Sequence, residues 1–219
     1  WFECSGTMND AETVLTAGHC VYEHDGAGYA DWIWVYPAYD GTLFPVGAYG
    51  YAHGTHFYAP SDWVTNGDYN YDIGIIEVTR AVGMLTGWFA WSYGGACDEW
   101  ALKQLYHNPS YPAESCGQPG LHTGVDMYEW GGYFDSCPGW PTEQQLRLDT
   151  TPGCFTAVWG GMSGSGAYYY DGVTPFVHAV CSHGHRSSYG DYTRQWKGWV
   201  DYTQGQFIPE ARGSSFDLQ

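Results

Sequence analysis

Three side chains of chemically active type stand in separate short stretches of the 219-residue chain. His19 lies in "VLTAGHC", Asp72 heads "DIGIIEV", and Ser163 lies in "GGMSGSGAY". An imidazole can serve as general base for a serine hydroxyl, and a carboxylate can hold that imidazole in the required tautomer. Each stretch alone is typical of ordinary structure: a packed histidine, a strand-start aspartate and a flexible turn. Only the three together indicate nucleophilic catalysis.

Glycines surround the candidate nucleophile. Gly161 and Gly164 flank Ser163 immediately before the strand-like "AYYY". Glycine permits a tight turn with an exposed Oγ, a close substrate approach and backbone N–H groups aimed at one point. The stretch is therefore compatible with a nucleophile loop, although on its own a flexible Gly/Ser turn explains it as well.

Composition excludes several classes of partner. The chain has 24 acidic and 7 basic side chains, for a formal net charge of −17. That balance argues against nucleic acids and anionic membranes as partners. Seven cysteines without a C-x-x-C pair favour disulfides in a secreted protein over a zinc ribbon. Aromatic residues make up 19%, which suits a β-rich fold or a Tyr/Trp-lined carbohydrate or peptide cleft.

Short apolar runs between Gly, Pro and Asp predict an all-β fold. The predicted strands are 12–17, 31–39, 72–78, 144–150, 166–170 and 176–182. One helix is predicted over 192–202, where Trp196, Trp199 and Val200 have i, i+3, i+4 spacing. Residues 100–107 are a weaker helix candidate, and 80–100 is interpreted as the connection between two halves.

The order His, Asp, Ser, with the motifs "TAGHC" and "GMSGSG", resembles the chymotrypsin-like serine peptidases, most closely their V8-like glutamyl endopeptidase branch. "YDIGIIEV", "SYPA", "LDTTPG" and "FVHAVCSHG" resemble further family segments. The resemblance implies two antiparallel six-stranded β-barrels with a C-terminal helix. The first barrel, 1–88, would carry His and Asp; the second, 89–207, would carry Ser and the specificity pocket; 208–219 would be a tail.

Roles carry over residue by residue from this resemblance. Ser163 is expected to be the nucleophile, His19 the general base and acid, and Asp72 the group that orients His19. The backbone N–H groups of Gly161 and Ser163 would form the oxyanion hole. The substrate pocket would include Ser182, His183 and Gly184. The implied activity is secreted, acyl-enzyme hydrolysis of peptide or protein substrates with no cofactor and no metal.

The resemblance also guides the cysteines. Cys4–Cys20 matches the family bridge that anchors the histidine loop. Cys97–Cys116 and Cys137–Cys154 rest on closeness in sequence, and other pairings stay open. Cys181 is left over and is expected to behave as a small buried hydrophobe.

Two positions depart from the family pattern. Met162 precedes the nucleophile where pancreatic enzymes have Asp and V8-like enzymes Asn or Gln, so we expect it to pack rather than to form an ion pair. Cys181 stands where V8-like enzymes carry a histidine that reads acidic side chains, so glutamyl specificity does not follow directly. His183 or His185 could substitute.

Only Trp1 to Glu3 precede Cys4, so a preceding segment or a partner chain is expected to complete the first barrel. Two rival functions stay open at this point. One is a catalytically inactive trypsin-like homologue that acts as a binding or structural module. The other is a non-proteolytic, aromatic-rich binding protein, for example of glycans.

Overall fold

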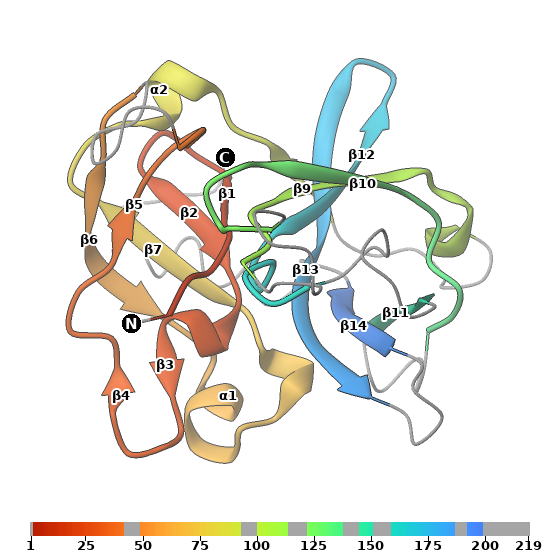
Figure 1. Cartoon of the computed structure of the whole chain (residues 1–219), viewed down its shortest axis with the longest axis horizontal. Helices are drawn as coiled ribbons and strands as arrows, with labels where there is room; N and C mark the ends of the chain where they lie inside the picture. Colours follow the sequence, from red (N-terminus) through yellow and green to blue (C-terminus); the bar gives the residue numbers. More distant parts are fainter. Residues whose placement is uncertain are drawn as a thin grey trace, which may run out of the picture.

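The structure is a computed structural model that describes residues 2–41, 49–92, 100–113, 122–137, 145–150, 159–186 and 192–198. The described part is mostly β-strand, with a few short helices, as the alternating apolar runs predict (Figure 1). Cys97, Cys116, Cys154 and the tail 208–219 lie outside the described residues.

The first sheet has five antiparallel strands in the order β1-β2-β7-β6-β5. Its strands are β1 Thr7–Met8, β2 Thr13–Thr16, β5 Trp34–Val35, β6 Ala52–Tyr58 and β7 Gly74–Val78. A separate hairpin joins β3 Tyr22–Glu23 to β4 Gly28–Tyr29. The short helices beside this sheet are η1 Gly18–Cys20, α1 Ser61–Asn66, η2 Tyr69–Tyr71 and α2 Gly83–Thr86.

The second sheet has seven strands in the order β10-β9-β12-β13-β14-β11, and β8 pairs in parallel with β13. Its strands are β8 Ala90–Trp91, β9 Tyr106–Ser110, β10 Tyr128–Gly132, β11 Gln145–Thr150, β12 Gly166–Asp171, β13 Thr174–Arg186 and β14 Tyr192–Gly198; η3 spans Ala101–Lys103. The two sheets lie on opposite sides of the molecule (Figure 1). The described residues thus give five and seven strands in the two sheets, and the two six-stranded barrels stay a prediction.

The predicted C-terminal helix is wrong for the part that the structure describes. Residues 192–198 form strand β14, which pairs with β13 on one side and β11 on the other. The tryptophan spacing is compatible with a helix, but Gly198 lowers the helix propensity of the segment. The edges of β13 and β11 instead offer backbone hydrogen bonds on both sides of β14. The weaker helix at 100–107 is reduced to η3, after which the chain enters β9.

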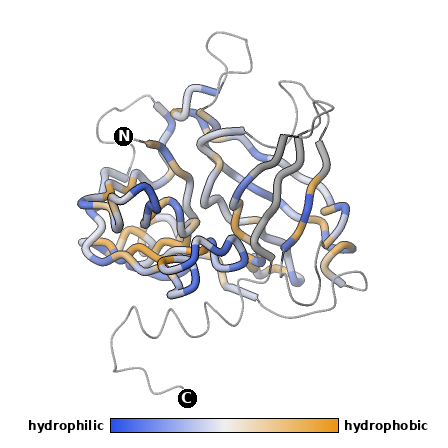
Figure 2. Tube along the Cα trace, turned by 90° about the horizontal axis from the view of Figure 1, so that it is seen from below, coloured by the Kyte–Doolittle hydropathy of each residue, from blue (hydrophilic) through white to orange (hydrophobic). Residues whose placement is uncertain are grey.

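Strands β2 and β7 are buried on both faces, and that burial ties the two sheets together. The side chains of Val14 and Ile76 pack in one hydrophobic cluster on one face of the first sheet. Those of Leu15 and Ile75 point to the opposite face and belong to a second cluster. Successive side chains of a strand point to opposite faces, so adjacent residues serve different clusters. Leu15 and Ile75 pack with Val177 and Val180 of β13. Figure 2 shows hydrophobic and hydrophilic stretches alternating along the traced chain.

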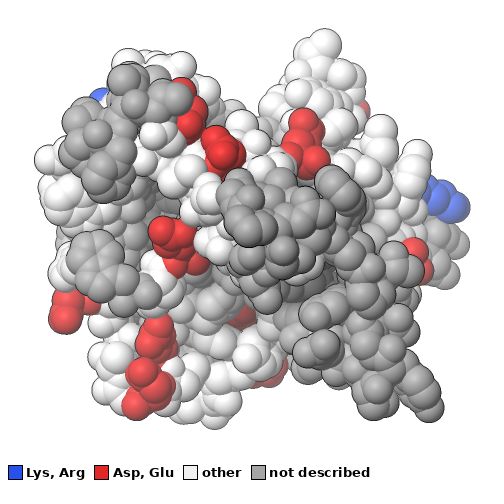
Figure 3. All heavy atoms as spheres, viewed as in Figure 1, with Lys and Arg blue, Asp and Glu red and all other residues white. Residues whose placement is uncertain are grey.

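Charge is unevenly distributed on the surface. Figure 3 shows acidic side chains scattered over one face and basic ones only at its margins. Within the described ranges, no helix combines the length and hydrophobicity needed to span a bilayer.

Candidate active site

His19 sits in the single turn η1 that follows strand β2. Gly18 leaves little space for a side chain, because a Cβ there would lie 2.9 Å from Cδ1 of Trp63 and 3.1 Å from Oδ1 of Asp72. Trp63 is itself buried, and its ring centroid is 6.4 Å from that of His19. The glycine before the histidine therefore lets a carboxylate and an indole approach the turn closely.

Asp72 binds His19 at two places. The carboxylate accepts the backbone N–H of His19 at Oδ1 over 2.8 Å, and Nδ1 of the ring lies 2.9 Å from Oδ2 and 3.1 Å from Oδ1. A carboxylate only accepts, so Nδ1 must carry the proton, which leaves Nε2 as the ring's acceptor when the imidazole is neutral. The pair thus presents the tautomer that a general base requires.

Asp72 stays ionised although it is fully buried. Burial alone would raise the pKa of its carboxyl, but hydrogen bonds and charge from His19, a hydrogen bond from Ser182 and the backbone N–H of His19 outweigh burial and hold the pKa below its ordinary value. The Ser182 hydroxyl donates to Oδ2 of Asp72. Hydrogen bonding to the charged form is therefore what stabilises the carboxylate.

The loop that carries Ser163 depends on two glycines with positive φ. Gly161 has φ +90° and Gly164 φ +85°. A Cβ at Gly161 would lie 2.5 Å from the carbonyl oxygen of Tyr111. One at Gly164 would lie 2.1 Å from Oγ1 of Thr16. Left-handed backbone and this crowding explain why glycine occupies both positions.

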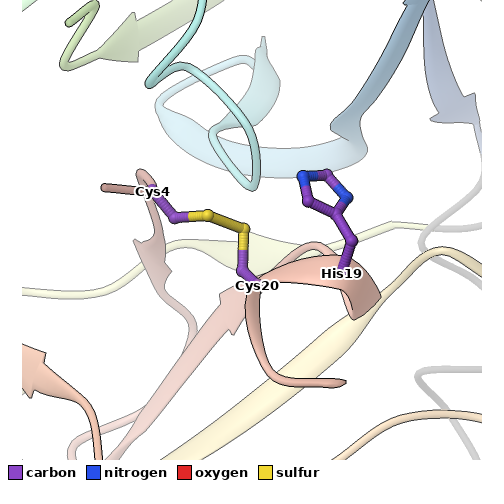
Figure 4. A group of neighbouring side chains, drawn as sticks. All are labelled: Cys4, His19 and Cys20. Atoms are coloured by element: carbon purple, nitrogen blue, oxygen red, sulfur yellow. A yellow bond between two sulfur atoms is a disulfide. The ribbon is translucent and has the colours of Figure 1, made fainter. Parts of the chain in front are cut away.

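The same contacts bring the serine loop against the histidine strand. A Cβ at Gly164 would also lie 2.9 Å from the backbone nitrogen of Ala17, two residues before His19. Ser5 reinforces the junction: its N–H donates to the carbonyl of Ser163 over 2.8 Å, and its hydroxyl donates to that of Gly161 over 2.9 Å. Figure 4 shows the serine loop reaching down between the Cys20 sulfur and the His19 ring.

No hydrogen bond joins Ser163 to His19 within the described part of the chain. Catalytic hydrogen bonds are often long without substrate and shorten when it binds, so this does not separate the two residues functionally. Gly164, the residue after Ser163, still approaches Thr16 and Ala17 closely, and these two residues lead into the turn that carries His19.

Two backbone N–H groups of the serine loop have no acceptor among the described residues. Met162, Gly164 and Ser165 donate to carbonyls of Trp159, Cys181 and Met162, whereas no bond from the N–H of Gly161 or Ser163 occurs in this part of the chain. Such unused donors beside a nucleophile suit a developing oxyanion.

The three residues predicted to line the substrate pocket have different surroundings. The side chain of Ser182 is committed to Asp72, and His183 follows it on β13 with its ring 4.0 Å from that of Tyr69. Gly184 pairs through its backbone register with Arg194 of β14. Sequence reasoning missed Ser5 and Trp63, and only their short spacing from Cys4 and Asp72 could have drawn attention to them.

Met162 and Cys181 are packing residues. Met162 is 3% exposed and Cys181 is 0% exposed, and both belong to the core cluster of the second sheet. The packing role expected for Met162 is therefore confirmed. Cys181, which is not in a disulfide, presents no polar group to the surface.

The predicted Cys4–Cys20 disulfide is present, and it pins the chain start to the end of η1 (Figure 4). Cys137 is also disulfide-bonded, while its predicted partner lies outside the described residues. Among the described side chains, one cluster has metal-like spacing: Cys4, His19 and Cys20, whose ligand atoms lie within 4.8 Å of one another. Both sulfurs are in the disulfide and offer no thiolate, so this cluster does not fit a metal ion.

Sequence comparison with known proteins finds two relatives from Bacillus species. The chain is 39% identical over 90 residues to a glutamyl endopeptidase of Bacillus licheniformis. It is 38% identical over 90 residues to an extracellular metalloprotease of Bacillus subtilis. These segments cover 41% of this chain and only 27% and 28% of the two relatives. No model of a known protein family matches.

Solved structures match over nearly the whole chain. A Glu endopeptidase covers 95% of this chain and 85% of its own at a TM-score of 0.72 and 21% identity. The protease Anisep of Arthrobacter nicotinovorans covers 96% and 89% at 0.72 and 24% identity. The thermostable serine protease AL20 covers 98% and 92% at 0.71 and 17% identity. At these identities the likeness establishes the fold.

Proposed function

We propose that this chain, which resembles the V8-like branch of the chymotrypsin-like peptidases in sequence and fold, is a secreted serine endopeptidase. The observation that carries the proposal is the His19–Asp72 pair, held by a ring and a backbone hydrogen bond beside a glycine-framed serine loop. A packing role would not require a buried, ionised Asp72. The inactive-homologue alternative has no comparable account of this arrangement.

The chemistry follows from the roles of three side chains. Ser163 Oγ attacks the scissile carbonyl carbon while Nε2 of His19 takes the hydroxyl proton. Asp72 holds the ring and stabilises the imidazolium that forms. The N–H groups of Gly161 and Ser163 would bind the oxyanion. His19 then returns the proton to the leaving amine. In the second half of the reaction, His19 takes a proton from water, the water attacks the acyl group, and the proton goes back to Ser163.

Substrate preference does not transfer with the fold. Cys181 is fully buried at the position from which V8-like enzymes present a histidine. We propose instead that the β13 segment from Ser182 to Gly184 lines the pocket, with a peptide or protein as substrate. Secretion is favoured by the disulfides and by the extracellular relative.

Hydrolysis of an unfolded protein substrate tests the proposal. Wild type should generate new peptide N-termini, Ser163→Ala should lose nearly all turnover, and the control Ser61→Ala on α1 should retain it. A chelator should leave the rate unchanged, which separates this mechanism from that of a metalloprotease. Equal turnover by wild type and Ser163→Ala would overturn the assignment.

A further inference from the structure

We infer that His183 is a positioning residue that acts on Asp72 through Ser182, so that a second histidine supports the catalytic pair from the substrate side. This inference rests on the proposed function. Its basis is an unbroken chain of contacts from His19 to Asp72, Ser182 and His183.

The protons along this chain fix the direction of every hydrogen bond. Ser182 has one hydroxyl proton, and it goes to Asp72, since an ionised carboxylate can only accept. Nδ1 of His183 lies 2.9 Å from Oγ of Ser182. The serine oxygen must accept there, so Nδ1 of His183 carries a proton whether the ring is neutral or charged.

Burial makes the link consequential. Asp72 is 0% exposed and Ser182 is 2% exposed, so water cannot replace a lost donor at either group without a cost. Hydrogen bonds in a chain polarise one another, and the donation from His183 strengthens the donation from Ser182 to Asp72. His183 itself is only half-buried and is therefore open to solvent.

His183 has neighbours on two adjoining elements, η2 and β14. From η2 the ring of Tyr69 lies tilted against that of His183, with the centroids 4.0 Å apart, and Oδ1 of Asp68 accepts two N–H groups of Asn70. On β14 the backbone register partner is Gln195. Through the Ser182 hydroxyl, His183 is linked to the carboxylate of Asp72.

Two effects follow for catalysis. Without the His183 donor, the Ser182 hydroxyl is less firmly held and the carboxylate becomes more basic. A more basic Asp72 stabilises the His19 imidazolium, so the acid limb of the activity profile should move to higher pH. Loss of a single hydrogen bond should lower the rate by about 3- to 10-fold.

Inactivation by a small fluorophosphonate provides the readout, because this probe needs no peptide-binding subsite. The second-order rate is measured against pH for wild type, His183→Phe, His183→Asn and His183→Gln. Asn places an N–H near the position of Nδ1, whereas the amide of Gln reaches toward Nε2. We expect a slower rate and an upward shift for Phe and Gln, and substantial rescue by Asn. Equal behaviour of Asn and Phe would overturn the inference.

A double-mutant cycle adds a second criterion. If His183 acts through Ser182, then His183→Phe should change the rate little in a Ser182→Ala background. Additive effects would contradict the link, and the thermal unfolding midpoint of each variant identifies folding defects. Should wild type fail to react at Ser163, the proposed function fails; should it react while all His183 variants match it, only this inference fails.

Discussion

Asp72 accepts two hydrogen bonds from His19, one from its backbone N–H over 2.8 Å and one from its ring Nδ1–H over 2.9 Å. The first bond fixes where the turn η1 sits and the second fixes how the ring faces. A hydrogen-bonded carboxylate at this position is thus both a structural anchor and an electrostatic partner. Variants that separate these two properties are informative.

Asp72→Asn keeps the size of the side chain but introduces a neutral amide. An amide that donates to Nδ1 would force the wrong His19 tautomer, and the imidazolium would lose its counter-charge. We expect turnover to fall by on the order of 10⁴-fold while the fold is retained. Steady-state hydrolysis together with circular dichroism measures both quantities.

The matched control is Asp62→Asn on helix α1, where the carboxylate contacts only the Asn66 amide among the hydrogen bonds described. Its turnover should equal that of wild type. A small effect of Asp72→Asn, comparable to that of this control, would mean that the His19–Asp72 pair is structural.

Gly164→Ala tests how the serine loop is seated. A Cβ at Gly164 would lie 2.1 Å from Oγ1 of Thr16 and 2.4 Å from the carbonyl oxygen of Ser5, and φ is +85°. We expect backbone strain to lower the free energy of unfolding by about 1–3 kcal/mol. Turnover should fall strongly because Ser163 is displaced. Chemical denaturation and hydrolysis rates give the two values.

Gly172→Ala is the matched control, since Gly172 has φ +64° but no heavy atom of the described structure within 4 Å of where a Cβ would lie. It should cost about 1 kcal/mol and leave turnover intact. If both variants lost activity equally, backbone strain rather than the contact with Thr16 would be responsible.

His178 should make stability depend on pH. Burial lowers its pKa to about 3 from an ordinary 6.5, although hydrogen bonding to Ser92 opposes the shift. Below 6.5 the unfolded chain binds a proton on this ring that the folded chain does not, so stability is complete above that pH and falls as pH decreases. The free energy of unfolding should drop by about 1 kcal/mol per pH unit between roughly pH 6 and 4.5.

Urea unfolding of wild type and His178→Asn across this range measures the effect. The variant lacks the titrating ring and should show a flatter profile. Asp72 cannot produce the same slope, because its lowered pKa confines its contribution to pH values below its ordinary 3.8. Parallel profiles of the two proteins would disprove the role of His178.

Sequence patterns predicted the strands that hold His19 and Asp72, because β2 and β7 are apolar runs with clear punctuation. The bridge Cys4–Cys20 followed from the family resemblance and is confirmed. The strand β14 was mistaken for a helix, since the edges it pairs with come from β13 and β11, which are distant in sequence. Long-range pairing of this kind leaves no local trace.

Side-chain partners across the two sheets were equally beyond the sequence. Ser182 was assigned to the pocket by its position, yet its hydroxyl contacts a carboxylate 110 residues away. Ser5, which ties the serine loop to the first strand, gave no pattern at all. The sequence spacing indicated which residue types could take part in catalysis. The contact between Ser182 and Asp72 became visible only in the packed structure.

Mapping the site of fluorophosphonate attachment tests the central claim most directly. The intact mass of wild type should increase by one adduct, and peptide mapping should place it on Ser163. Ser163→Ala should remain unmodified, and His19→Ala should react far more slowly, since the hydroxyl then lacks its base. Absence of an adduct on folded wild-type protein, or an adduct on another serine that Ser163→Ala retains, would contradict the account.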